Sequence, residues 1–174
     1  MELEDALNQR QSVRSYTGEP ATPEQLEAVL TAAYEAPIGM GKYDSIHLTV
    51  VTRRSLLDAI DAAAARLFGN PELHPLYGAP TLVVVSSSGE GNVASANVAA
   101  IIQNMSLAAV EQDLGSCYIY GAIRALVQDP ALLSELELPE GFSPLGSIIL
   151  GQTEERYAPR EVPDGHRFAQ NVVA

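Results

Sequence analysis

Residues 91–110 form an uncharged stretch that constrains the fold more than any other part of the chain. Its pattern predicts a helix over about residues 92–114, and a helix of roughly 20 residues is about 30 Å long. Apolar residues lie nearly all round this helix, so it must be enclosed. Its borderline length and its polar members favour a buried helix over a membrane span. Those members are Ser95, Asn97, Gln103, Asn104 and Ser106.

A chain of 174 residues has little material with which to enclose such a helix. We expect homodimerisation to solve this problem, with the helix near the twofold axis. A central helix wrapped by its own chain is the alternative. The chain length is close to the usual size of one domain, so we expect a single domain over residues 1–174, with a core that needs no disulfide or metal.

Helical and strand patterns alternate along the chain. Thr22, Pro23 and Gln25 form a capping box with proline at the first helical position, which predicts a helix through about residue 35. Residues 81–86 are almost continuously apolar, as expected of a strand that is covered on both faces. We expect further helices at residues 3–8, 55–68, 122–127 and after Asp129-Pro130, and further strands at residues 46–52, 116–120 and 145–150. This order predicts helices on both faces of a sheet.

The charge of the chain restricts its partners. The formal net charge is −12 and the isoelectric point is about 4.5, which disfavours nucleic acids and anionic membrane surfaces. The single cysteine, Cys117, excludes an internal disulfide and is expected to be a small core residue. The N-terminal residues lack the pattern of a signal peptide, so we expect a cytoplasmic protein.

Two patterns that often carry chemistry are weak here. Gly89, Gly91 and Ala94 fit the G-x-G-x-x-A pattern of a dinucleotide-binding turn, with Glu111 about 20 residues further on. The turn is lengthened by serines and Glu111 falls inside the predicted helix, so a surface loop is the favoured interpretation. The three histidines are far apart and lack Cys or carboxylate partners at ligand spacing, which disfavours a metal site.

Residues 10–14 form the most informative cluster. If this segment is extended, alternation places Arg10, Ser12 and Arg14 on one side of it. Two guanidinium groups and a hydroxyl suit an anionic, planar ligand, because arginine binds phosphate and stacks on rings. An exposed basic turn near the end of the chain is an equally good explanation of the cluster alone.

Five segments in order along the chain resemble the FMN-dependent nitroreductase family, here as a short NAD(P)H:flavin oxidoreductase-like member. They are residues 10–14 (Arg-Gln-Ser-Val-Arg), Ala36-Pro37 before a strand, Ala79-Pro80 before the next strand, Gln103-Asn104 in the helix that leads into Leu114-Gly115-Ser116, and Leu150-Gly151. The resemblance implies an α+β fold, a three-layer α/β/α sandwich with a mixed, mostly antiparallel sheet and a long central helix at the dimer interface. It also implies a homodimer with two FMN sites, each built from both subunits, and an extended tail from about residue 152 that packs on the partner.

The resemblance assigns roles to four polar residues. Arg10 and Ser12 would hold the FMN phosphate and the ribityl chain. Arg14 would lie near N1 and the C2 carbonyl of the flavin, where negative charge accumulates on reduction. Arg160 matches the basic residue that closes on the phosphate.

Two further segments match parts of the family's flavin site. Pro37, Ile38 and Gly39 would reach the flavin from the partner subunit. Tyr120 and Gly121 match the place where a backbone N–H approaches flavin N5.

The activity that the resemblance implies is a ping-pong reaction. NAD(P)H would reduce FMN at N5 and leave, and a nitroaromatic, a quinone or a similar acceptor would then take the electrons. The cofactor carries this chemistry, so the chain needs no catalytic acid or base. Family members usually carry Asn and Gln-Pro-Trp where residues 39–45 stand, and this chain has no tryptophan. A flavin- or ligand-binding protein of the same fold without efficient turnover is therefore the second hypothesis, and a Rossmann-type NAD enzyme based on Gly89 and Gly91 is the third.

Overall fold

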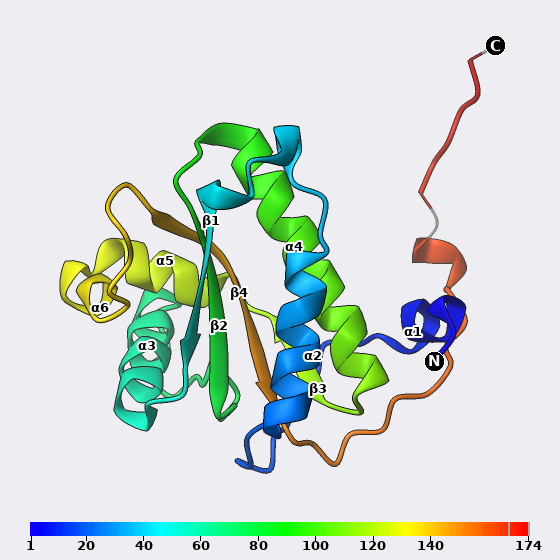
Figure 1. Ribbon diagram of the computed structural model, residues 1–174. Coiled ribbons are helices and arrows are strands. Elements are labelled where there is room, and N and C mark those ends of the chain that lie inside the picture. The colour runs from blue at the N-terminus through cyan, green and yellow to red at the C-terminus, as the bar shows by residue number, and fades with distance from the viewer. Residues whose placement is uncertain (167, 174) are drawn as a thin grey trace.

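The computed structural model describes residues 1–166 and 168–173 (Figure 1). The α-helices are α1 (Leu3–Gln9), α2 (Pro23–Tyr34), α3 (Arg54–Leu67), α4 (Gly91–Glu111), α5 (Gly121–Gln128) and α6 (Pro130–Ser134). The strands are β1 (Ile46–Val51), β2 (Thr81–Ser87), β3 (Gly115–Tyr118) and β4 (Ser143–Gly151). Short 3-10 turns lie at η1 (Gly39–Gly41), η2 (Tyr43–Ser45) and η3 (Asp164–His166). Each helix and strand expected from the sequence is present, with its ends shifted by a few residues.

The strands form one four-stranded sheet in the order β1-β2-β4-β3. All three neighbouring pairs of the described residues are antiparallel, so the parallel pair expected of a mixed sheet is not among them. The reason lies in the strand order. β2 and β3 run in the same direction, but β4 is inserted between them and runs opposite to both.

Helices cover both faces of this sheet, as Figure 1 shows. Leu82 and Val84 of β2 point to the face that packs against α3 and α5, while Val83 and Val85 point to the face that packs against α2 and α4. All residues of β2 are buried, which explains the unbroken apolar run in the sequence. The expected three-layer α/β/α arrangement is therefore confirmed.

The helix α4 is only partly enclosed by its own chain. It is long and apolar enough to cross a membrane by length and composition, but its buried side packs on the sheet and on α2. Val93, Ala96, Ala99 and Gln103 lie on the other side and are exposed. The helix ends three residues before the expected Leu114, because Asp113 adopts a left-handed backbone conformation with φ of 51°. A monomer thus leaves one face of its most apolar helix uncovered.

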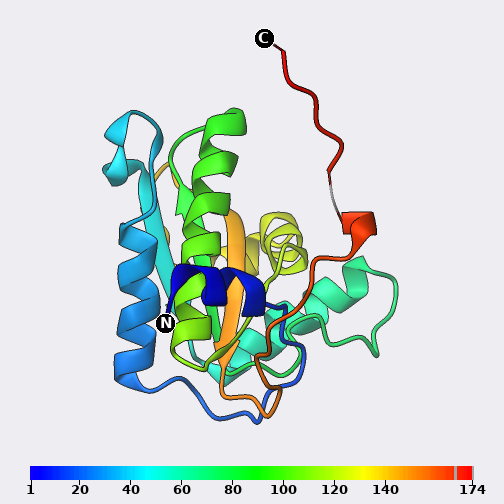
Figure 2. The ribbon, with the colours of Figure 1, turned by 90° about the vertical axis from the view of Figure 1, so that its right-hand side faces the viewer.

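The two ends of the chain also expose apolar side chains. α1 lies across the C-terminal part of α4 (Figure 2), and the amino group of Met1 is 3.1 Å from Glu111 Oε1. Only Ala6 of α1 is buried, whereas Leu3 and Leu7 are exposed. Residues 168–173 leave the body of the protein (Figures 1 and 2), and Phe168 is 95% exposed.

Candidate functional site

The cluster predicted at residues 10–14 lies along the free edge of β3. The Val13 N–H donates to the Ser116 carbonyl at 2.9 Å, so this segment runs beside the strand. Val13 is fully buried, while Ser12 is half-buried and Arg14 is exposed. Val13 therefore points inward between two more exposed neighbours, the shared side of Arg10, Ser12 and Arg14 stays a prediction, and Arg10 stands at the end of α1, just before the extended run.

Groups of the predicted cluster, together with Glu155, act on the thiol of Cys117. Burial raises the pKa of the Cys117 thiol, and this is the dominant effect. The Ser12 hydroxyl, and then the positive charges of Arg14 and Arg10, act in the opposite direction on that pKa. The thiol is buried, so Cys117 is the core residue that the sequence predicted, placed directly beneath the cluster.

The segment after β4 returns to the same place. The Thr153 hydroxyl donates to the Ser15 carbonyl at 2.7 Å, and Glu155 Oε1 accepts the Arg14 N–H at 2.9 Å. Further along, the Arg160 N–H donates to Asn8 Oδ1 at 2.6 Å, and Arg160 Nε donates to the Asn8 carbonyl at 3.0 Å. Arg160 thus lies at the end of α1, two residues from Arg10. The fold brings together three arginines from the two ends of the chain.

A small aromatic pocket lies just beyond β3, at Tyr120 and Gly121. It has a volume of about 310 Å³, and no residue that lines it is charged. Its aromatic members are Phe68, Tyr77, Tyr118 and Tyr120. A Cβ on Gly121 would lie 2.8 Å from the Phe68 ring, so only glycine allows this close packing. Gly121 follows Cys117 by four residues, and four residues of chain span at most about 14 Å. The aromatic pocket therefore lies within about this distance of Cys117.

Pro37, Ile38 and Gly39 lie at the opposite end of α4. The Gly39 N–H donates to Asn97 Oδ1 at 3.0 Å, and a Cβ on Gly39 would lie 3.0 Å from a methyl group of Val93. The arginine cluster lies beside Ser116, beyond the C-terminal end of α4 at Glu111, and Asn97 and Glu111 are separated by a rise of about 21 Å along the helix. A single chain therefore does not bring these three residues to the arginine cluster.

The glycine-rich turn does not form a dinucleotide site of the Rossmann kind. Gly91 begins α4 with a positive φ of 72°, and residues 88–90 separate it from β2. After α4, however, β3 pairs with β4 and not with β2, so the described strands lack the adjacent parallel pair of a βαβ unit. Glu111 contacts the amino group of Met1 at the far end of the helix.

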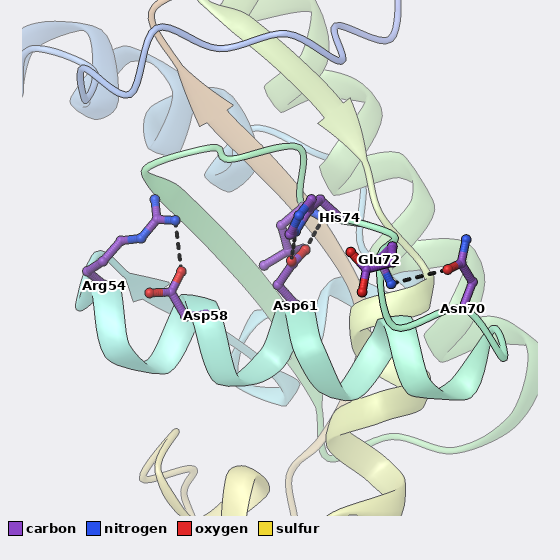
Figure 3. A network of polar contacts seen from close by, with 7 residues as sticks. Arg54, Asp58, Asp61, Asn70, Glu72 and His74 are labelled. Carbon is purple, nitrogen blue, oxygen red and sulfur yellow. Dashed lines mark hydrogen bonds and ion pairs between the residues drawn. The ribbon is translucent and has the colours of Figure 1, made fainter.

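Sequence reasoning missed one polar pair, between His74 and Asp61. His74 Nδ1 is 2.9 Å from Asp61 Oδ2, and the Leu76 N–H donates to Asp61 Oδ1 at 2.7 Å (Figure 3). The two side chains line a cavity of about 640 Å³ between α3 and residues 71–79. Among the described residues, no group of three potential metal ligands gathers here or elsewhere. No spacing rule links a helix residue to a loop histidine, so the sequence carried no signal for this pair.

Comparison with known proteins agrees with these features. A sequence family described as the nitroreductase family matches residues 7–152. A nitroreductase from Bacteroides fragilis, crystallised with bound FMN, is 28% identical, with 98% of this chain and 100% of that chain covered and a TM-score of 0.82. An FMN-bound nitroreductase from Desulfitobacterium hafniense is 23% identical, with 98% and 99% covered and a TM-score of 0.83. An FMN-dependent nitroreductase from Clostridium difficile is 24% identical, with 97% of each chain covered and a TM-score of 0.76.

Proposed function

This chain belongs to the nitroreductase family, and we propose that it is an FMN-dependent oxidoreductase that takes electrons from NAD(P)H and passes them to a nitroaromatic, a quinone or a similar acceptor. The observation that carries the proposal is the convergence of Arg10, Arg14 and Arg160 beside β3, next to an uncharged aromatic pocket. The Bacteroides fragilis relative, which resembles this chain over its whole length, was crystallised with FMN.

The polar residues suit the charged end of FMN. Guanidinium groups bind phosphate through paired, charge-assisted hydrogen bonds, and Arg10 and Arg160 lie close together at the end of α1. Ser12, whose hydroxyl acts on the Cys117 thiol of β3, would contact the ribityl chain. The chain is acidic overall, so a group of three arginines is a specific feature of this region, although the Glu155 carboxylate also lies there.

The other side of the site suits a flat, uncharged ring. Tyr120 and Gly121, at the N-terminus of α5, would border the ring edge. Arg14 would stabilise negative charge on the ring, because a fixed cation lowers the energy of charge that develops nearby. When bound, FMN would supply the transfer of a hydride from NAD(P)H and then of electrons to the acceptor. The protein would orient the ring and exclude water from it.

We further propose that the functional unit is a homodimer. The uncovered face of α4 and the exposed Leu3, Leu7 and Phe168 are surfaces that a second copy would bury. In such a dimer Pro37, Ile38 and Gly39 would approach the flavin held by the partner, and the extended tail from about residue 152 would pack on the partner. Each chain would contribute one domain over residues 1–174. The single cysteine is buried and free, which suits a cytoplasmic protein.

The absorbance spectrum of the purified protein tests the proposal. We expect a flavin spectrum, release of FMN into the supernatant after heat denaturation, and rapid bleaching when NADH or NADPH is added without oxygen. A colourless protein that neither binds added FMN nor oxidises NAD(P)H would overturn the proposal. Bound flavin that neither NADH nor NADPH reduces would instead support a flavin-binding protein without turnover.

A further inference from the structure

The loop formed by residues 71–79 separates two cavities. On one side it borders the 640 Å³ cavity that contains Asp61 and His74, and on the other side it borders the 310 Å³ aromatic pocket at Gly121. Leu73 and Tyr77 line both cavities, whereas Pro75 lines only the aromatic pocket. The position of this loop therefore sets the width of the pocket.

Asp61 provides the polar attachment of the loop. The backbone hydrogen bonds of the Leu73, Tyr77 and Ala79 N–H groups are made to carbonyls of residues 70–76, within or next to the loop itself. Among the described residues, the polar contacts that join residues 71–79 to the helix α3 are those of Asp61 with His74 and with the Leu76 N–H. The Asp61 side chain is only 16% exposed, and its bond with the Leu76 N–H is partly shielded from water, whereas its contact with His74 is exposed (Figure 3).

The neighbouring charged residues Arg54 and Asp58 pair with each other and not with Asp61. Arg54 is paired with Asp58 at 2.8 Å, one turn earlier on α3 (Figure 3). Asp58 lines the same cavity as Asp61 but has no hydrogen bond to the loop. Apolar packing of Leu76 and Ala79 in the core also anchors the loop, so loss of the Asp61 contacts would shift the loop without unfolding it.

We propose that Asp61 is a positioning residue for the electron acceptor: it holds the 71–79 loop against α3, so that Leu73, Pro75 and Tyr77 form a fixed wall of the aromatic pocket. This inference rests on the proposed function, because it takes the pocket beside Gly121 as the place where a planar, uncharged acceptor approaches the flavin. Aromatic side chains on both the loop and β3 favour such a molecule over a charged one.

Steady-state kinetics with 1,4-benzoquinone at saturating NADH tests the inference. In Asp61→Ala we expect a rise of about 10-fold in the KM for the quinone, the scale of losing a hydrogen bond to a charged group, with kcat and flavin content within about twofold of the unchanged protein. Asp61→Asn keeps an acceptor for the Leu76 N–H and should recover most of the KM. Asp58→Ala is the matched control, since it removes a carboxylate from the same cavity without touching the loop, and should leave KM unchanged.

Amide hydrogen exchange on flavin-free protein gives a second readout that does not depend on activity. The Leu76 and Tyr77 amides should exchange faster in Asp61→Ala than in Asp58→Ala. Unchanged exchange, or faster exchange with an unchanged quinone KM, would overturn the inference, as would equal losses of kcat and flavin content at constant KM. Failure of the proposed function would show differently, as absence of flavin reduction in the unsubstituted protein, and faster loop exchange would then support only the attachment of the loop.

Discussion

The two ends of α4 carry two unlike parts of the candidate site. Beside β3, just beyond the C-terminal end of α4, the arginine cluster (Arg10, Arg14 and Arg160) is charged and is held by hydrogen bonds between the two ends of the chain. Near Val93, the turn at residues 37–39 has no charged side chain, and Asn97 holds its backbone. The arginine cluster suits an anion, whereas the turn could contact a ligand only through its backbone and its apolar side chains. Since about 21 Å of helix separates them, we infer that a complete site needs two copies of the chain.

The largest effect is expected in the arginine cluster. Arg10→Ala should weaken FMN binding by about 10- to 100-fold, because a charge-assisted hydrogen bond contributes about 1.5 to 3 kcal/mol. Titration of flavin-free protein with FMN, followed by flavin fluorescence, measures the change. Arg53→Ala is a suitable control, because Arg53 pairs with Glu135 on the α3 and α6 side of the molecule. Equal affinities of the two variants would show that the cluster does not hold the phosphate.

A smaller effect is expected in the turn. Gly39→Val should weaken FMN binding by about 10-fold, since the added side chain would meet Val93 and overpacking costs about 1 to 3 kcal/mol. Adding Val93→Ala to this variant makes room for the new side chain and should recover part of the affinity. If the FMN affinity of Gly39→Val is unchanged, the turn is not part of the site.

A heterodimer of these two variants tests whether each FMN site is built from one chain or from both. In a heterodimer of Arg10→Ala and Gly39→Val chains, a site built from both subunits leaves one site intact and puts both substitutions in the other. Co-expressed chains with different affinity tags should therefore bind about one FMN per two chains with full affinity, when each homodimer binds weakly. If each site came from a single chain, no tight site would form.

The sequence predicted the local parts of this structure well. The capping box at Thr22 is present with both hydrogen bonds, because this pattern is read within a few residues, and Val13 is the buried residue of the segment 10–14. The insertion of β4 between β2 and β3 and the pairing of Asp61 with His74 depend on contacts distant in the chain, which no local pattern encodes. The resemblance placed Arg160 near the N-terminal cluster, and its contacts with Asn8 agree with that position.

A still smaller effect on FMN binding is expected for Arg160, which reaches the cluster from the other end of the chain. Arg160→Ala should weaken FMN binding by about 5- to 10-fold, less than Arg10→Ala, because Arg160 already donates a hydrogen bond to Asn8 through its Nε and has fewer free donors. Arg160→Lys keeps the charge but loses the planar fork, so an intermediate affinity is expected. The same FMN titration applies. A loss equal to that of Arg10→Ala would show that both arginines bind the phosphate equally.

The smallest effect is a loss of stability in alkali, and it concerns the segment that leads to Arg160. The Tyr157 hydroxyl donates to the Leu114 carbonyl at 2.8 Å, and burial raises the pKa of Tyr157 to about 12. The unfolded chain would lose this proton near pH 10, so the stability that the neutral phenol provides is present below pH 10 and is lost as the pH rises towards 12. Burial also raises the pKa of Tyr16 in the same region.

Thermal unfolding at pH 9, 10 and 11 measures this loss. The unchanged protein should lose about 1 kcal/mol from Tyr157 over this range, or roughly 2 to 4 °C. Tyr157→Phe should show a shallower decline, because the proton no longer contributes, while Tyr34→Phe, at an exposed position beside the turn, should decline like the unchanged protein. Protection against hydrogen exchange, taken relative to the intrinsic base-catalysed rate, should then fall first around residues 8–15 and not around residues 37–39 at pH 11. A uniform fall in protection would mean that the two ends of α4 are equally stable, and that the arginine cluster does not depend on the tail.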